Sequence, residues 1–400
     1  MSSTTPDTPA IDGGTPVRPT LLEFSPPLLG DAEIASVVET LRSGWLTSGP
    51  RAKQLEERFA ARVGMPHAIA TSSCTTALHL ALLASGLGEG DEVITTSFTW
   101  PATTNAIVHT GARPVFADID PGTLNIDPAA VRALVGPRTR AVMPVHFAGG
   151  PCDMDAIMAI AREHSLLVVE DAAHAVETTV GDRPVGSIGD YTCFSLYATK
   201  SLAGGEGGVV TTASDEAAGR LRLLRAQGIT RDPWRRQQSR SLGHYDVVLP
   251  GYKANLADLQ AAVALPKFDR LEDQLAIRQR LVEQYDQGLA ELPGIEPIGR
   301  PPFGRHAHHL YVVRIDPALA GGDRDRYAAA LMAENIATGL HFLPVHGLTW
   351  YRDNLPPVSL PATEAAGATV LSLPLGGAHT EQDVDDVLAA VRKLHAAFTR

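Results

Sequence analysis

Hydrophobic and polar positions follow two alternating patterns over the first two thirds of the chain. Short apolar runs predict strands at 67–71, 92–95, 114–117, 141–145, 166–170, 192–196 and 208–211. Elsewhere apolar residues recur at helical spacing and predict helices near 31–43, 53–63, 75–85, 101–110, 128–135, 153–164 and 214–225. Apolar strands that alternate with amphipathic helices are typical of a mainly parallel sheet with helices on both faces. We therefore expect an α/β domain here.

The pattern changes after residue 254. Residues 254–290 predict one long or kinked helical stretch, which Pro266 interrupts. A connection rich in proline and glycine follows. Beyond it the pattern predicts a strand at 309–315, a helix at 325–336, a strand near 338–343 and a helix at 381–397. The chain thus divides into a flexible N-terminal arm (1–20), a large α/β domain (21–265) and a smaller C-terminal α+β domain (266–400).

Composition narrows the classes of function. A chain of 400 residues is longer than one hydrophobic core ordinarily supports, so we expect more than one domain. A net charge of -11 argues against nucleic-acid binding, which requires clustered lysine and arginine. The three cysteines form no disulfide framework, the first residues do not resemble a signal peptide, and no apolar run approaches the roughly 18 residues that cross a bilayer. We expect a cytoplasmic protein without a membrane or nucleic-acid partner.

Polar residues follow two of the predicted strands in the first part of the sheet, where parallel sheets bind their ligands. Residues 71–77 lie between a strand and a helix and supply hydroxyl groups beside exposed helix amides, which could hold a phosphate. Taken alone, an ordinary helix cap is the simpler explanation of this run. Trp100 follows the next strand and could stack on a flat heterocycle, although an aromatic residue at a strand end is more often part of the core.

Asp171 and Lys200 follow two further strands. A carboxylate directly after a buried strand needs a partner, and a pyridinium N–H would be one; a Mg²⁺ ion or a helix cap is the alternative. Lys200 is one of only five lysines and precedes the glycine-rich run 204–208, where a solvated loop lysine is the alternative. Ser195 could reach the same phosphate as the 71–77 run. Together these are the parts that a pyridoxal-phosphate (PLP) site requires.

Several longer motifs resemble those of the DegT/StrS-type sugar aminotransferases, which are fold type I PLP enzymes. They are SGWLTSGP (43–50), GDEVITTSFTW (90–100), EDAAHA (170–175), FSLYATKSLAGGEGG (194–208), GYKANLADLQAA (251–262) and GLHFLPVH (339–346). The resemblance runs in collinear order from about residue 20 to the end, and it is strongest to the branch that aminates UDP-4-keto-pentose sugars (the 4-amino-4-deoxy-L-arabinose aminotransferases). It implies a mainly parallel seven-stranded sheet domain with a smaller C-terminal α+β domain.

The resemblance also implies roles for individual residues. Lys200 would form the Schiff base with PLP and act as the general base, Asp171 would pair with the pyridinium nitrogen, and His174 would lie near the phenolic oxygen. The other expected cofactor contacts are Ser73, Cys74, Thr75, Trp100, Ser195 and Lys253. Lys253 would reach the phosphate of the neighbouring subunit, which implies a homodimer with composite active sites. The expected substrate contacts are Trp45, Tyr197, His341 and Phe342.

The activity that the resemblance implies is amino transfer from L-glutamate (or glutamine) to a keto sugar, and specifically to a UDP- or dTDP-linked 4-keto sugar. Pyridoxamine phosphate (PMP) would be the intermediate form of the cofactor. A dehydratase or aromatizing synthase of the same family is the alternative, although Lys200 argues against the 3-dehydrases, in which a histidine replaces it.

Two readings from other classes receive less support. A metal hydrolase could use His306, His308 and His309 together with His341 and His346. His309 leads directly into an apolar strand, however, so a cluster at a strand edge is favoured and we expect no metal ion. A non-catalytic PLP-binding regulator would need a DNA-binding helix pair or a basic extension, and the sequence shows neither.

Overall fold

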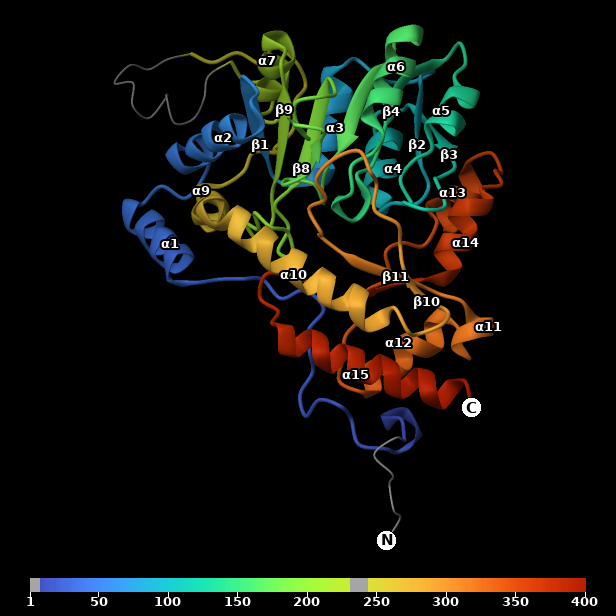
Figure 1. Ribbon diagram of the computed structural model, residues 1–400. Helices are drawn as coiled ribbons and strands as arrows, with labels where there is room; N and C mark the ends of the chain where they lie inside the picture. Colours follow the sequence, from blue (N-terminus) through green and yellow to red (C-terminus); the bar gives the residue numbers. More distant parts are fainter. Residues whose placement is uncertain (1–7, 231–243) are drawn as a thin grey trace.

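The computed structural model describes residues 8–230 and 244–400, and its large domain is built on a seven-stranded sheet (Figure 1). The strands are β1 (His67–Thr71), β2 (Glu92–Thr96), β3 (Arg113–Ala117), β4 (Thr139–Met143), β5 (Leu167–Asp171), β8 (Tyr191–Ser195) and β9 (Gly208–Thr212). Their order is β1-β9-β8-β5-β4-β2-β3. The neighbours from β8 to β3 pair in parallel, whereas β9 runs antiparallel to β1 and β8. The predicted mainly parallel α/β sheet is confirmed.

Helices cover both faces of this sheet because successive strand residues point to opposite sides. Ile69 and Val93 belong to a core beneath three helices, namely α3 (Cys74–Ala84), α4 (Pro101–Val108) and α7 (Asp215–Leu224). Their neighbours Ala70 and Ile94 belong to a core on the opposite face, whose helices are α2 (Pro50–Val63), α5 (Pro128–Leu134), α6 (Met154–His164) and α9 (Asp258–Ala264). Burial on both faces explains why these strands are continuous apolar runs.

The smaller domain is a three-stranded antiparallel sheet with helices packed against it. Its strands are β10 (Ile295–Pro297), β11 (Tyr311–Ile315) and β12 (Val370–Leu373), and its principal helices are α10 (Leu271–Leu289), α12 (Arg324–Ala333) and α15 (Glu381–Phe398). The predicted stretch at 254–290 consists of α9, the 3-10 helix η3 (Leu265–Arg270) and α10. Pro266 lies at the start of η3, and α10 then runs from the large domain into the smaller one (Figure 1).

The strand predicted near 338–343 was wrong. Gly339 exchanges both backbone hydrogen bonds with Ser372 of β12, at 2.9 and 2.8 Å, but the pairing stops there. The chain then leaves the sheet and reaches the large domain, where the amide of Val345 donates to the carbonyl of Ser97 at 2.8 Å. His341 and Phe342 are thereby carried away from the small sheet toward the ends of the large one.

Several short elements were not predicted. They are the strands β10 and β12 of the smaller sheet, together with β6 (Thr179–Val180), β7 (Arg183–Pro184), α11 (Pro317–Ala320), α13 (Thr349–Asn354), α14 (Pro361–Thr369) and the 3-10 turns η1 (Ala10–Asp12), η2 (Phe147–Gly149) and η4 (Val345–Gly347). The helix α1 (Asp31–Ser43) agrees with its prediction. In the part of the chain that the structure describes, no helix is long and apolar enough to cross a membrane.

The N-terminal segment lies along the smaller domain. Residues 1–7 of the arm expected at 1–20 lie outside the described residues. Farther along, the amides of Ala10 and Val17 each donate to the buried carboxylate of Glu334 at 2.8 Å, and the ammonium group of Lys393 pairs with the same carboxylate at 2.9 Å. Three donors thus compensate the charge of Glu334 and hold residues 8–22 against α12 and α15.

Candidate active site

The site forms where the carboxyl ends of parallel strands meet the beginnings of the following helices. Asp171 is the last residue of β5 and Ser195 the last of β8. Cys74 begins α3, and Trp100 immediately precedes α4. The parallel topology therefore brings residues about 120 positions apart to one edge of the sheet, which is the edge where α/β proteins bind ligands.

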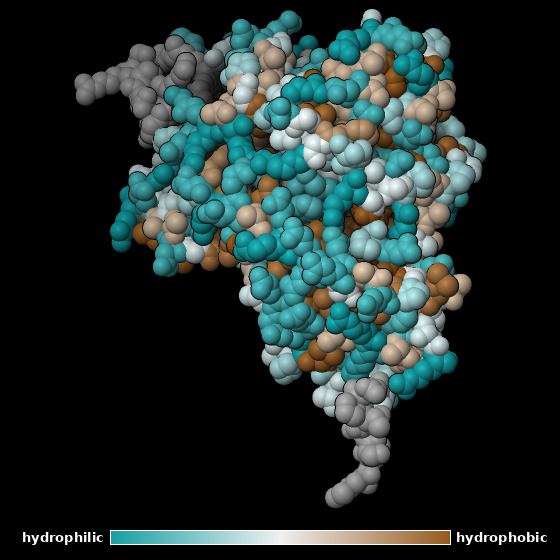
Figure 2. Space-filling view, viewed as in Figure 1, coloured by the Kyte–Doolittle hydropathy of each residue, from teal (hydrophilic) through white to brown (hydrophobic). Residues whose placement is uncertain are grey.

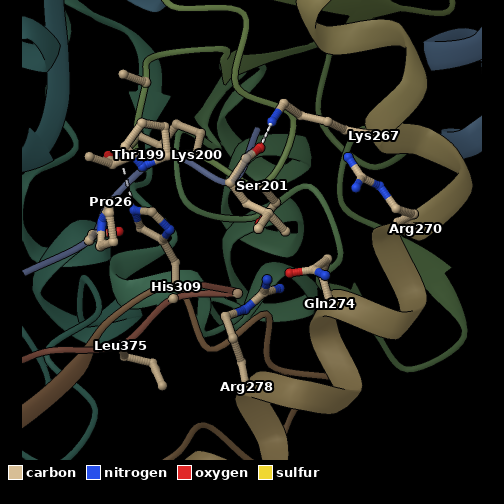
Figure 3. Close-up of a pocket in the computed structure, with 16 residues that line it drawn as sticks. Pro26, Thr199, Lys200, Ser201, Lys267, Arg270, Gln274, Arg278, His309 and Leu375 are labelled. Atoms are coloured by element: carbon tan, nitrogen blue, oxygen red, sulfur yellow. Dashed lines mark hydrogen bonds between the residues drawn. The ribbon is translucent and has the colours of Figure 1, made fainter. Parts of the chain in front are cut away.

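Lys200 lies in a turn that the backbone fixes on both sides. Its amide donates to the carbonyl of Tyr197 at 2.9 Å, and its own carbonyl accepts from Ala203 at 3.0 Å. The side-chain nitrogen Nζ lies 3.1 Å from Nε2 of His309 (Figure 3). Burial disfavours the ammonium form and lowers the pKa of Lys200 to about 8, although nearby Cys74 and Asp171 oppose the shift. An appreciable fraction of the side chain is therefore a neutral amine near neutral pH.

Asp171 is a buried carboxylate held by two hydrogen bonds. Oδ2 accepts from the hydroxyl of Thr103 at 2.7 Å, and Oδ1 accepts from the amide of Ala173 at 3.1 Å. Burial raises the pKa of Asp171, while these two hydrogen bonds and the charges of Lys200 and His146 pull it down. A cationic N–H at this point, such as a protonated pyridine ring, would compensate the buried charge.

Three aromatic rings line the space near Lys200. The His174 and His309 ring centroids are 4.4 Å apart, and His174 lies nearly parallel to Phe342 at 6.1 Å. Nδ1 of His174 is buried and has no hydrogen-bond partner among the described residues. Buried polar atoms are normally paired. A ligand oxygen beside His174, such as the phenolic oxygen of PLP, would supply the missing partner.

The loop before α3 has the geometry of a phosphate cradle. The hydroxyl of Ser73 caps the helix by accepting from the amide of Thr76 at 3.1 Å. The first intrahelical bond runs from Ala77 to the carbonyl of Ser73, so the amides of Cys74 and Thr75 precede the helical ladder. Such amides at a helix N-terminus favour an anion.

Ser195 lies next to this loop through β9. It is paired with Gly208, and a Cβ at Gly208 would come within 2.4 Å of the carbonyl oxygen of Ser73. Only glycine therefore allows β9 to pass so close to the cradle. The hydroxyl of Ser195 accepts from the amide of Tyr197 at 3.2 Å, and this bond leaves the hydroxyl proton available to a phosphate oxygen.

Three of the expected contact residues are partly or largely exposed in the single chain. Trp100 has 65% of its surface exposed, and its ring centroid is 6.4 Å from that of Phe342. Tyr197 is 48% exposed. Trp45 is half-buried, and its ring N–H donates to the carbonyl of Ser48 at 3.1 Å. Part of each of these side chains is therefore accessible to another molecule.

Lys253 is exposed and lies beside the phosphate loop of its own chain. Its backbone is fixed there because the amide of Ser72 donates to the carbonyl of Ala254 at 2.8 Å. Its ammonium group donates to the side chain of Asn255. The lysine thus lies on the surface at the rim of the site and does not enter the cradle.

His341 lies in the segment that leaves the small sheet. Its Nδ1 pairs with the hydroxyl of Ser372 at 2.9 Å, and its ring stacks on Phe24 at 5.4 Å. Burial, together with the charge of Lys200, lowers the pKa of His341 to about 4, so the ring is neutral at physiological pH. His341 and Phe342 therefore form a neutral wall between the two domains.

A second side of Lys200 faces a pocket below the strand ends. The pocket is lined by residues 25–28, 198–201, His309, 375–377 and, from η3 and α10, Lys267, Arg270, Gln274 and Arg278 (Figure 3). Its cations are already paired: Lys267 donates to the carbonyl of Leu28, and the guanidinium of Arg278 pairs with buried Glu177 at 2.6 Å. These contacts hold α10 against the large domain.

The histidines at 306, 308 and 309 do not converge on one point. His306 and His308 stack on each other at 4.5 Å, whereas His309 turns toward Lys200. In residues 8–230 and 244–400 no three side chains of the metal-binding types lie close enough together to hold an ion. The metal-hydrolase reading therefore receives no support from the described part of the chain.

Two residues of the site were not identified from the sequence. Thr103 holds the carboxylate of Asp171, and His309 contacts Lys200. The sequence pattern instead favours His309 as part of a cluster at a strand edge. A polar residue directly beside a buried strand is the same signal that pointed to Asp171, and it could have been applied to His309 as well.

Comparison with known proteins identifies the family. A model of the DegT/DnrJ/EryC1/StrS aminotransferase family matches residues 27–392. The chain belongs to this family. The spore coat polysaccharide biosynthesis protein SpsC of Bacillus subtilis (strain 168) is 49% identical over 376 residues, which cover 93% of this chain and 97% of SpsC.

Solved structures extend the likeness to the fold. DesI, in a structure with its TDP-sugar product, has a TM-score of 0.88 and 36% identity, covering 99% of this chain and 97% of that chain. The PLP-form of the putative sugar aminotransferase Spr1654 from Streptococcus pneumoniae has a TM-score of 0.87 and 30% identity, covering 94% and 99%; its PMP-form matches as well. The protein is thus a fold type I PLP-dependent aminotransferase, and PLP and PMP are its cofactor forms.

The donor set of the site fits this cofactor. Lys200 supplies a nucleophilic amine, Asp171 a buried carboxylate for the ring nitrogen, and the cradle at 73–75 supplies amides for the phosphate. The unpartnered Nδ1 of His174 is available to the phenolic oxygen. Each polar group of PLP therefore has a partner among the residues at one edge of the sheet.

Proposed function

We propose that this enzyme transfers an amino group from L-glutamate (or glutamine) to a nucleotide-linked keto sugar, a UDP- or dTDP-4-keto sugar, in aminosugar biosynthesis. One observation carries the proposal. The amine of Lys200 lies in a buried polar site that fits PLP, in a chain 36% identical to DesI, whose structure holds a TDP-sugar product. The 49% identity to a polysaccharide biosynthesis protein supports the same class of pathway.

Lys200 would move the proton in each half-reaction. PLP, when bound, supplies the electron sink that makes the α-proton of an amino acid acidic. The neutral amine of Lys200 would take that proton at Nζ, hold it as an ammonium group and deliver it to the neighbouring carbon. Asp171 would keep the ring nitrogen protonated, which is the role that its burial and its two hydrogen bonds suit.

The sugar would bind above the strand ends, between the exposed aromatic residues. Half-buried Trp45 and exposed Tyr197 offer surfaces on which a sugar ring can stack, and Trp100 would stack on the cofactor ring. His341 with Phe342 would close the site from the side of the smaller domain. A neutral wall suits a neutral sugar ring, whereas the diphosphate of the nucleotide would remain toward solvent. The dehydratase and aromatizing synthase alternatives use the same lysine and differ in the product that they release.

A homodimer would complete the site. Lys253 lies at the rim of the cradle and does not enter it, so we propose that it reaches the phosphate bound to a second copy of the chain. Exposed hydrophobic side chains gather along the outer edge beside α1, among them Leu29, Ile34, Leu41 and Leu46 (Figure 2). Burying such residues is a driving force for association. We further propose that the dimer works in the cytoplasm, where PLP and sugar nucleotides are available.

The decisive experiment is a visible spectrum followed by two additions. An absorption band near 410–430 nm that moves toward about 330 nm after L-glutamate would show the donor half-reaction. Keto sugars linked to UDP or dTDP would then restore the first band, and mass spectrometry would identify an amino sugar. Glutamine in place of glutamate tests the alternative donor. A band that never responds to any amino donor would contradict the proposal.

Two controls separate the alternatives. Lys200→Ala should abolish both the band and the covalent adduct that borohydride traps, and peptide mapping of the wild-type protein should place that adduct on Lys200. A product that has lost water without gaining nitrogen would instead indicate a dehydratase. Amination of a free aminocyclitol precursor but of no nucleotide sugar would reject the substrate class while retaining the aminotransferase.

A further inference from the structure

None of the roles proposed for Lys200 requires its contact with His309. The two nitrogens are 3.1 Å apart, and His309 is 8% exposed. His309 comes from the smaller domain, two residues before β11, whereas Lys200 belongs to the large domain. The amide of His309 donates to the carbonyl of Ala148 at 3.0 Å, which fixes its backbone against the large domain. The ring is thus held in one place beside Nζ.

The ring can accept a hydrogen bond but is poorly placed to carry a charge. Burial lowers the pKa of His309 well below its ordinary value, and the charges of Lys200, His174, Arg278 and His341 lower it further. A neutral imidazole offers one nitrogen lone pair. An ammonium group donates to such a lone pair in a charge-assisted hydrogen bond, which is stronger than the bond between a neutral imidazole and a neutral amine.

We propose that His309 is a positioning residue that holds the protonated side chain of Lys200 whenever Lys200 is not bound to the cofactor. Nε2 accepts a hydrogen bond from the ammonium group after Lys200 has taken the proton from the donor substrate. The proton stays on Nζ until Lys200 delivers it to the neighbouring carbon, so His309 gains and loses no proton in the cycle. The inference rests on the proposed role of Lys200 as the proton carrier.

Among the groups around Lys200, His309 is the neutral side chain that can accept a hydrogen bond from this ammonium group. The other charged or titratable groups that face Lys200 or His309 are Cys74 at the start of α3, Asp171 at the end of β5, His174 in the following loop, His341 before η4, and Arg278 on α10. Asp171 is occupied by Thr103 and Ala173 and is assigned to the ring nitrogen. Burial keeps the pKa of the Cys74 thiol well above its ordinary value, so that group is uncharged. His174 faces the cofactor oxygen through its unpartnered Nδ1.

The experiment titrates Lys200 directly in the full-length protein loaded with PMP, in which its amine is free. Protein labelled with ¹³C at the lysine side chains gives few signals because the chain has only five lysines, and Lys200→Met assigns the relevant one. The pH at the midpoint is measured for wild type, His309→Phe and His309→Gln. His308→Asn is the matched control: it lies one residue away, stacks on His306, and has φ 48, which asparagine tolerates.

We expect His309→Phe to lower the midpoint by about one to two pH units, which is the size of a lost hydrogen bond to a charged group. His309→Gln should recover at least half of the shift because its amide oxygen can accept the same bond. His308→Asn should titrate like wild type. The donor half-reaction should slow in His309→Phe and show a larger isotope effect with L-glutamate deuterated at the α-carbon.

Two results would overturn the proposal. Unchanged midpoints in both His309 variants would show that the bond does not support the ammonium form. Equal shifts in the Phe and Gln variants would show that packing, and not hydrogen bonding, sets the pKa. Borohydride trapping on Lys200 is scored separately, so a failed role for His309 is distinguishable from a failed role for Lys200. Thermal melting confirms that each variant is folded before it is titrated.

Discussion

At the scale of single residues, the chemistry depends on two buried groups of opposite charge. Lys200 and Asp171 both pay a desolvation cost in their charged forms, and each partly compensates the other. The compensation is incomplete, because burial remains the largest influence on the pKa of each group. A cofactor that brings its own cationic N–H to Asp171 and its own aldehyde to Lys200 satisfies both groups.

The rate at which the apoprotein takes up PLP should therefore depend on pH through Lys200. Burial lowers the pKa of Lys200 to about 8, so the nucleophilic amine becomes about tenfold scarcer for each pH unit below that value. Uptake, followed by absorbance in stopped flow, should rise with pH up to about 8 and then level off. Lys53→Gln, which changes a lysine whose side chain is 75% exposed, should keep the same profile. A midpoint near the ordinary lysine value would contradict this account.

Asp171→Asn should impair the enzyme far more than it impairs the fold. The amide keeps the hydrogen bond from Thr103 but cannot carry the negative charge that the protonated ring needs. Removing one partner of a buried ionic pair costs about 3–5 kcal/mol, which corresponds to roughly 10²–10⁴-fold in rate. Single-turnover kinetics with L-glutamate measure the loss, and a melting curve within a few degrees of wild type would show that the fold survives. A variant of nearly full activity would remove Asp171 from its assigned role.

Strand-end residues could be predicted from the sequence because local signals mark them. A polar side chain directly after a buried apolar run needs a partner, and this signal points to Asp171. The scarcity of lysine and the glycine-rich run at 204–208 point to Lys200. Thr103 gave no such signal because a threonine in the first turn of a helix is ordinary. The aromatic contacts of His174 with His309 and Phe342 join segments more than 130 residues apart and could not be derived from any local pattern.

At the scale of elements, one side chain fixes the beginning of α2 beneath the active-site rim. The carboxylate of Asp258, which is 1% exposed, accepts from the amides of Gly49, Arg51 and Ala52 at 2.8, 3.1 and 2.9 Å. These amides belong to the start of α2, which lacks intrahelical acceptors for them. The same contacts join α2 to α9 and place the Trp45 loop.

Asp258→Ala should therefore lower the melting temperature more than removal of an ordinary cap. Three buried donors would lose their acceptor, at a cost of about 2–3 kcal/mol, or roughly 4–8 °C in melting temperature. Asp127→Ala is the matched comparison, because Asp127 caps α5 with a single bond to the amide of Ala129 at 2.9 Å. Calorimetry on both variants checks the ranking, and equal shifts would contradict it.

The prediction of elements succeeded where burial is uniform and failed where contacts are irregular. All seven strands of the large sheet were predicted to within two residues, because each is a short apolar run between helices. The segment near 338–343 has the same apolar character, but its side chains serve the domain interface and only Gly339 pairs with β12. Apolar composition shows that a segment is buried and does not show whether it is paired.

At the scale of the whole molecule, long-range contacts decide how segments far apart in the sequence come together. The buried carboxylate of Glu334 binds the amides of Ala10 and Val17, which are 324 and 317 residues away in the sequence. Lys200 and His309 are separated by 109 residues and join the two domains at the site. Periodicity predicts which faces are buried but contains no information about such pairs. The division into a sheet domain and a smaller α+β domain is predicted from the sequence alone, because the local pattern changes near residue 254.

The proposed composite site can be tested by mixing inactive subunits. Lys200→Ala and Lys253→Ala chains, carrying different tags and expressed together, should form a mixed dimer in which one site receives Lys200 from one chain and Lys253 from the other. Random pairing makes about half of the dimers mixed, with one intact site of two, so about one quarter of wild-type activity should return at limiting PLP. Mixing Lys200→Ala with Asp171→Asn should restore nothing, because both residues belong to the same chain's site. If the Lys200→Ala and Lys253→Ala pair also stayed inactive while gel filtration showed mixed dimers, Lys253 would act on its own chain, and the contact between Ser72 and Ala254 would be its route to the phosphate loop.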